Sequence, residues 1–141
     1  MPTTLGAFFD RYRRAFEAYD VDKLAGLIHV PCLIVSGGAL AAVAERDDLR
    51  KRLERQFERH REIGVSDAQF EVRAHRRLAA RFVSVDVQWT FFDSDATPMA
   101  EFGVNYTLTA PETGWKIACM LPLDIAPASS QAPVASPDGS G

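Results

Sequence analysis

Two tyrosines carry the side chains of this sequence that are best placed to do chemistry. Tyr12 falls in the middle of an apolar stripe with helical spacing, so its hydroxyl would enter apolar surroundings and need a hydrogen-bond partner there. It would either bond a backbone carbonyl as a core residue or donate to a ligand oxygen in a dry pocket. Tyr106 has the one hydroxyl on the apolar side of its strand pattern, and the same two interpretations apply to it.

Histidine supplies the remaining candidate for proton transfer. His29 stands near the predicted end of a short helix, just before Pro31, where the helix dipole would stabilise it. If its ring enters a pocket instead, it could act as an acid or base near neutral pH. The candidate catalytic residues are therefore Tyr12 and His29. We expect His60 and His75 to be solvated, and three histidines without ligand spacing predict no metal site.

A four-stranded pattern between residues 69 and 121 must position these side chains. Residues 82–92 and 100–109 alternate apolar and polar types, which is typical of strands with one buried face. The predicted inner face consists of Val83, Val85, Val87, Trp89, Phe91, Phe102, Val104, Tyr106, Leu108, Trp115, Ile117, Cys119 and Leu121. Such a face needs a cover, and the chain before it is mostly helical in pattern.

Three helices are predicted upstream, over residues 4–19, 20–28 and 47–63, with two short strands at 32–35 and 40–44. On the last helix, Asp48 and Arg52 have the spacing of an exposed ion pair.

The element order is α-α-β-β-α-β-β-β-β, an α+β arrangement. We expect one domain over residues 1–124. Residues 125–141, rich in Pro, Ala and Ser, form a tail that we expect to be disordered.

Composition narrows the class of protein. The 141 residues are 47% hydrophobic and 25% charged, as in an ordinary globular domain, and the net charge is −3. That balance gives no general attraction to nucleic acid or to an anionic membrane, and no apolar run is long enough to cross a bilayer. Charged residues interrupt the first apolar run, so we expect a cytoplasmic protein. Cys32 and Cys119 are expected to be buried free thiols.

Two stretches resemble a known superfamily. They are the run Arg11-Tyr12-Arg13-Arg14-Ala15-Phe16-Glu17-Ala18-Tyr19-Asp20-Val21-Asp22-Lys23-Leu24 and the ending Gly114-Trp115-Lys116-Ile117-Ala118. With the element order, they resemble the nuclear-transport-factor-2-like superfamily from about Thr4 to Asp124, closest to its SnoaL-like members (polyketide cyclase or ketosteroid isomerase type). The resemblance implies a cystatin-like roll, in which a cone-shaped curved antiparallel sheet is covered by three N-terminal helices.

The resemblance also permits a comparison with ketosteroid isomerase. An ungapped alignment through Asp22 places Tyr12 where that enzyme keeps its oxyanion-binding tyrosine, and Ser36 where it keeps its general-base carboxylate. A serine without an activating base cannot move a proton at neutral pH. The isomerase chemistry is therefore not transferable. Of the residues compared, only the oxyanion-binding tyrosine has a counterpart in this sequence, Tyr12.

Two hypotheses follow for function. The first is a small-molecule-binding domain for an apolar or aromatic molecule; if it is an enzyme, it would be a cofactor-free isomerase, cyclase or dehydratase. Its candidate ligand-binding residues are Tyr12, Phe16, His29, Trp89, Phe91, Tyr106 and Trp115. The second is a non-catalytic dimerising or binding module whose cone is filled by its own side chains. Under either hypothesis, the half-apolar outer face of the sheet suits a homodimer.

Overall fold

The computed structural model describes residues 4–110 and 114–123. Its elements are α1 (Leu5–Glu17), α2 (Val21–Ala25), β1 (Ile28–Ser36), β2 (Ala39–Val43), α3 (Arg46–Ile63), β3 (Asp67–Ala79), β4 (Phe82–Phe92), β5 (Pro98–Thr109) and β6 (Lys116–Leu123). The predicted element order is confirmed. The predicted tail at 125–141 lies outside the described residues.

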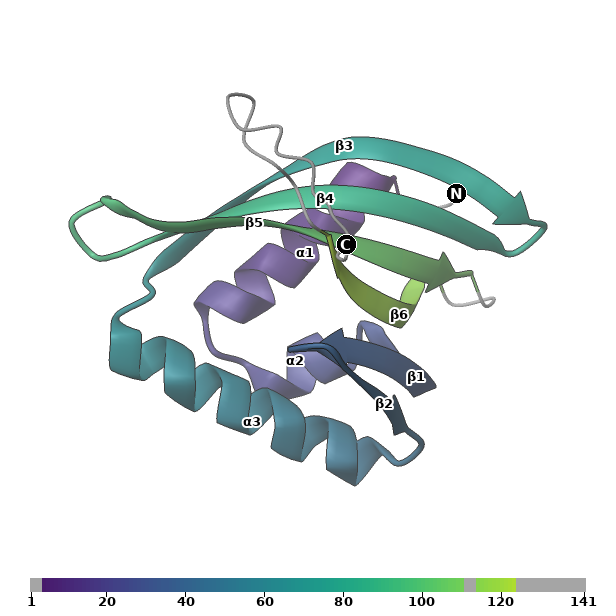
Figure 1. Cartoon of the computed structure of the whole chain (residues 1–141), viewed down its shortest axis with the longest axis horizontal. Coiled ribbons are helices and arrows are strands. Elements are labelled where there is room, and N and C mark those ends of the chain that lie inside the picture. Colours follow the sequence, from purple (N-terminus) through teal and green to yellow (C-terminus); the bar gives the residue numbers. More distant parts are fainter. Residues whose placement is uncertain (1–3, 111–113, 124–141) are drawn as a thin grey trace.

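The strands form a six-stranded sheet in the order β2-β1-β6-β5-β4-β3. Figure 1 shows the long strands β3, β4 and β5 arching over α1, with α3 on the far side of that helix. The α+β class with a curved sheet and N-terminal helices is confirmed. The expectation of a wholly antiparallel sheet is wrong at one place, because β1 and β6 pair in parallel. This pairing joins the β1–β2 hairpin to the later strands.

Helix α1 begins at its predicted cap and ends two residues early. The hydroxyl oxygen of Thr4 accepts a hydrogen bond from the amide of Ala7 at 3.1 Å, which satisfies one of the free amides of the first turn. Tyr19 takes a left-handed φ of 54°, and the helix stops at Glu17. The apolar stripe is buried as predicted, with Phe8, Phe9 and Phe16 at most 5% exposed.

The second helix is shorter than predicted, and this moves His29. Helix α2 ends at Ala25, and β1 begins three residues later because the backbone there bonds to β6: the amide of Ile117 donates to the carbonyl of Leu27 at 2.9 Å. His29 therefore lies in a strand and not at a helix C-terminus. Its Nδ1 is 3.0 Å from the carbonyl oxygen of Pro31, two residues along the same strand.

The face assignment of β6 was half wrong because the strand contains a bulge. Ile117 pairs with Leu108, but the next pair is Cys119 with Thr107, so β6 holds one extra residue there. Every later side chain is consequently shifted to the opposite face. The residues affected are Cys119 and Leu121, which were expected inside, and Met120, which pairs with Tyr106 and faces inward. Both cysteines are free thiols; Cys32 is buried and Cys119 half-buried.

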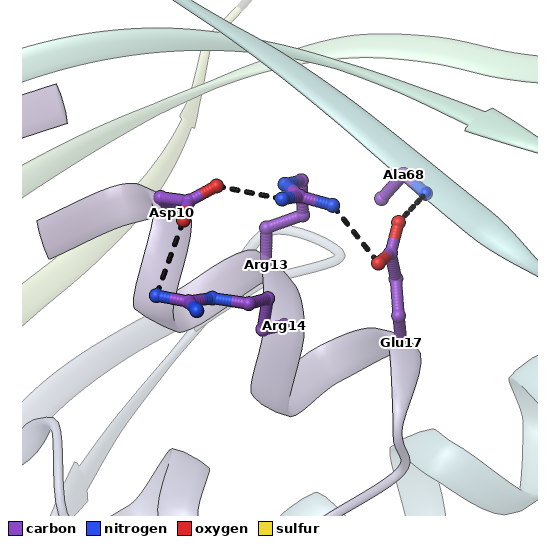
Figure 2. Close-up of polar contacts among 5 residues, drawn as sticks. All are labelled: Asp10, Arg13, Arg14, Glu17 and Ala68. Carbon is purple, nitrogen blue, oxygen red and sulfur yellow. Dashed lines mark hydrogen bonds and ion pairs between the residues drawn. The ribbon is translucent and has the colours of Figure 1, made fainter. Parts of the chain in front are cut away.

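A chain of charged groups connects α1 to the edge strand β3 (Figure 2). Asp10 accepts from Arg13 at 2.6 Å and from Arg14 at 3.2 Å, and Arg13 also donates to Glu17 at 2.9 Å. The second carboxylate oxygen of Glu17 accepts from the backbone amide of Ala68 at 2.9 Å. Hydrogen bonding to Arg13 lowers the pKa of Asp10. Glu17 thus satisfies an amide on the open side of β3 that no strand covers.

We expect Glu17→Ala to lower the free energy of unfolding by about 1–3 kcal/mol, since the buried amide of Ala68 would lose its acceptor. Urea unfolding measures the loss. Glu54→Ala is the matched control, because Glu54 is exposed on α3 and its side chain forms no ion pair within the described ranges. Equal losses in the two variants would show that the bond to Ala68 is not stabilising.

Candidate ligand-binding site

A cavity of about 210 Å³ lies between the helices and the inner face of the sheet. Its wall is built by α1, β1, α3 and the three strands β4, β5 and β6. The lining residues are Tyr12, Phe16, Ile34, Val35, Ser36, Arg52, Leu53, Gln56, Arg59, Trp89, Phe91, Phe102, Val104, Tyr106, Met120 and Pro122. Most of them are apolar or aromatic, with a few polar groups between, which is the usual composition of a small-molecule site.

The buried end of the cavity carries a small cluster of hydrogen-bonding groups. The indole Nε1 of Trp89 donates to the hydroxyl oxygen of Tyr106 at 2.9 Å, and both residues are 2% exposed. The hydroxyls of Tyr106 and Tyr12 also interact, and the two rings meet edge to face with their centroids 5.9 Å apart. Trp89, Tyr106 and Tyr12 therefore form one polar cluster at the buried end.

Both hydroxyls of this cluster can donate a hydrogen bond. Burial is the largest influence on both tyrosines, and it raises the pKa of Tyr12 and, further, that of Tyr106, so both phenols stay protonated. Among the residues that the structure describes, the Tyr106 hydroxyl is the polar group that interacts with the hydroxyl of Tyr12. Because Tyr12 lines the cavity, its O–H is available to an acceptor atom placed there.

Aromatic rings form much of the remaining wall. The rings of Tyr12 and Trp89 lie 5.5 Å apart, and Phe16 is stacked on Phe91 at 4.9 Å. Phe91 also meets Phe102 edge to face at 4.9 Å. Since these rings come from α1, β4 and β5, they hold one another in place across three elements. An aromatic ligand would meet both ring faces and ring edges in this cavity.

One side of the cavity is polar and positively charged. Arg52, Gln56 and Arg59 are spaced four and three residues apart on α3, so they share one side of the helix. The predicted Asp48–Arg52 ion pair is wrong. Neither arginine forms an ion pair within the described part of the chain, and no aspartate or glutamate described there lines the cavity. The sequence pattern had placed Arg52 on the exposed side of this helix, whereas the structure has it in the cavity wall.

His60 differs most from its sequence-based interpretation, because it is half-buried and not solvated. Its ring meets Phe16 at 5.0 Å and Phe91 at 5.3 Å, directly behind the cavity wall. Its Nδ1 is buried and has no partner among the described residues. Burial, with a smaller effect from the positive charge of Arg59, lowers the pKa of His60. The imidazole is therefore neutral at pH 7.

Five of the seven predicted ligand-binding residues lie together in the cavity wall, namely Tyr12, Phe16, Trp89, Phe91 and Tyr106. His29 and Trp115 do not line it; Trp115 is half-buried and packs against the core. Ser36, predicted from the isomerase alignment to occupy the general-base position, does line it.

No group of three His, Cys, Asp or Glu residues able to hold a metal occurs among the described residues. None of the helices described is long and apolar enough to cross a membrane.

The helices, the curved sheet and the cavity between them define the class of fold, and solved structures share it. A cystatin-like domain of unknown function from Nostoc punctiforme superimposes with a TM-score of 0.71 at 16% identity, covering 92% of this chain and 83% of that one. An NTF2-like protein of unknown function from Shewanella oneidensis gives 0.67 at 13%, covering 83% and 93%. A ketosteroid isomerase-like protein from Erwinia carotovora gives 0.62 at 20%, covering 87% and 95%.

The family itself is shown by sequence. The family model described as NTF2-like protein (DUF6841) matches residues 4–124, so the chain belongs to that family. The predicted superfamily is therefore confirmed. No curated protein sequence matches the chain. An NTF2-like fold with an internal cavity supports a small-molecule-binding domain, whereas the identities to solved structures are low enough that they show the fold alone.

We expect the folded-state pKa of His60 to lie below 6.5, because burial disfavours the charged ring. The unfolded chain then binds this proton more readily than the folded one. His60 thus contributes stability that is complete above about pH 6.5 and is lost as the pH falls through the folded-state value. Nuclear magnetic resonance titration measures that pKa, and His60→Phe assigns the signal.

The same variant tests the effect on stability. Urea unfolding at about pH 7.5 and about pH 5 should show a smaller pH-dependent loss for His60→Phe than for the parent chain. A His60 signal that titrates at or above 6.5 would show that the ring is solvated after all.

Proposed function

We propose that this protein binds a small aromatic or apolar molecule in the cavity, with an oxygen of the ligand accepting a hydrogen bond from Tyr12. One observation carries the proposal. The hydroxyl of Tyr12, next to the Trp89–Tyr106 hydrogen bond, lines a cavity whose wall is largely made of aromatic and apolar side chains. A ligand oxygen placed there can accept from this hydroxyl away from bulk water, where a hydrogen bond is stronger.

The size of the cavity limits the ligand. Pockets for drug-sized molecules begin at about 300 Å³, and this cavity measures about 210 Å³. The ligand that fits is therefore one or two rings with a short substituent, smaller than a steroid. The cone is neither wholly filled nor widely open. Its cavity lies along the Tyr12 and Phe16 half of α1, whereas Phe8 and Phe9 fill the other half.

Binding, with or without catalysis, fits the cavity better than isomerase chemistry does. Tyr12 could stabilise an oxyanion as a cofactor-free isomerase, cyclase or dehydratase of the SnoaL-like type would require. Ser36 nevertheless stands at the position that the isomerase alignment gives to the general base, and the described wall holds no carboxylate. A donor without a base can stabilise an enolate and cannot create it. The two free cysteines are compatible with a reducing compartment, and we propose that the protein is cytoplasmic.

Phenol should bind and quench the fluorescence of Trp89, which lies in the cavity wall. The chain has two tryptophans, so Trp115→Phe leaves Trp89 as the one reporter. In that background, Tyr12→Phe should weaken phenol binding by about 1–2 kcal/mol, the value of one buried hydrogen bond to a partly charged acceptor. Fluorescence titration measures both affinities.

Tyr19→Phe is the matched control for this change. The Tyr19 hydroxyl donates to the carbonyl of Val65 outside the cavity, so its loss should affect stability and leave phenol affinity unchanged. If Tyr12→Phe leaves phenol affinity unchanged, Tyr12 is a core residue and not a donor to the ligand. If phenol does not bind the parent chain, the proposed function is refuted.

A dimerising module is the second candidate function, and the outer sheet face favours it. Leu33, Leu121 and Phe82 are 42%, 41% and 43% exposed on that face, so a partner could bury several large apolar groups there. We expect a homodimer through this face. Light scattering at micromolar concentration should give twice the monomer mass, and the double variant Leu33→Lys, Leu121→Lys should give the monomer. A monomer for the parent chain would contradict this expectation.

A further inference from the structure

We propose that the ligand of this cavity is an anion, specifically a small aromatic carboxylate whose charged end is bound by Arg52 and Arg59. The inference deepens the proposed function and rests on it, because it assumes that the ring of the ligand occupies the aromatic part of the cavity. It adds a chemical class and an orientation: carboxylate toward α3, and any ring hydroxyl toward Tyr12.

The placement of the two arginines is the first support. They lie seven residues apart on α3, two helical turns that bring both side chains to one side of the helix, and both line the cavity. Gln56 lies between them and also lines it, which adds an amide donor. A guanidinium offers several N–H donors in a planar fork that matches the two oxygens of a carboxylate.

The second support is that these two charges have no partner among the described residues, although two other arginines of the helix do. On the same helix, Arg50 forms an ion pair with Asp22, and Arg46 donates to the carbonyls of Ala25 and Ile28. Arg52 and Arg59 form neither an ion pair nor a hydrogen bond within residues 4–110 and 114–123. The described wall of the cavity holds no carboxylate. The two positive charges beside it therefore attract an anion.

The third support is the exposure gradient across the cavity, which fixes the orientation. Tyr106 and Trp89 at one end are 2% exposed, whereas Arg52 is half-buried and Arg59 is exposed. A carboxylate placed at the buried end would lose its water without meeting a cation there, which is costly. At the arginine end it keeps both water and a counter-charge. The ring then extends inward, and its far edge meets the Tyr12 hydroxyl.

Three probes that share a phenol ring test the inference on the intact chain. They are para-hydroxyphenylpropanoate, its neutral amide and phenol, each titrated against Trp89 fluorescence in the Trp115→Phe background. We expect the carboxylate to bind about tenfold more tightly than the amide, as a charge-assisted bond is about twice as strong as a neutral one. This preference should shrink as the salt concentration rises.

The arginine variants separate recognition from overall charge. The double variant Arg52→Gln, Arg59→Gln should bind the carboxylate and the amide equally and should keep the parent affinity for phenol. The control is Arg55→Gln, which removes one positive charge from an exposed site on the same helix away from the cavity. That control should keep nearly all of the preference for the carboxylate.

The outcomes distinguish the inference from the proposal beneath it. If phenol and the amide bind and the carboxylate binds no more tightly, the anion inference is wrong and the proposed function stands. The same conclusion follows if the preference survives in the double variant, or if Arg55→Gln removes it equally. If none of the three probes binds the parent chain, both are refuted. Circular dichroism and urea unfolding confirm that each variant is folded.

Discussion

The packing of α1 against the curved sheet is the interaction on which the cavity depends. Phe8 and Phe9 are completely buried, and the ring of Phe9 lies 5.0 Å from that of Tyr106 on β5. These side chains fill one half of the concave face and hold the helix at a fixed distance from it. Tyr12 and Phe16, one and two turns further on, therefore stand over a part of the sheet that is not filled.

Helix α3 closes that open half, and its composition decides the character of the cavity. Leu49, Leu53 and Phe57 are buried and form a seam too narrow to cover the whole width of the opening. The residues beside the seam must therefore complete the wall, and these are Arg52, Gln56 and Arg59. A helix with a wider apolar stripe would have given a closed, apolar core at the same position.

The local patterns in the sequence were sufficient to predict the helices and strands and most of the aromatic residues that line the cavity. The alternation in β4 correctly predicted Val85, Val87 and Trp89 inside, and the stripe on α1 correctly placed Tyr12 toward the sheet. Alternation failed in β6, where one extra residue changes the face of Met120. A bulge depends on pairing between strands, and nothing in the β6 sequence alone indicates it.

The same limit explains His29 and His60. Whether residue 29 ends a helix or begins a strand is decided by the parallel pairing with β6, almost ninety residues later in the chain, as the Ile28–Ile117 pair shows. His60 has charged neighbours on both sides, which is typical of an exposed helix face, yet the rings of Phe16 and Phe91 cover it. Contacts between distant segments, rather than local propensity, decide these positions.

The chemical consequence is a cavity that holds donors at both ends and, among the described residues of its wall, no carboxylate base. Tyr12 donates at the buried end, and Arg52 and Arg59 donate at the exposed end. Such a wall stabilises negative charge that is already present and offers little means of removing a proton from carbon. The imidazole of His60 is neutral and close, but the rings of Phe16 and Phe91 stand between it and the cavity. The arrangement therefore favours molecules whose acceptor atoms match these donors, and we propose that recognition is the main chemistry of this site.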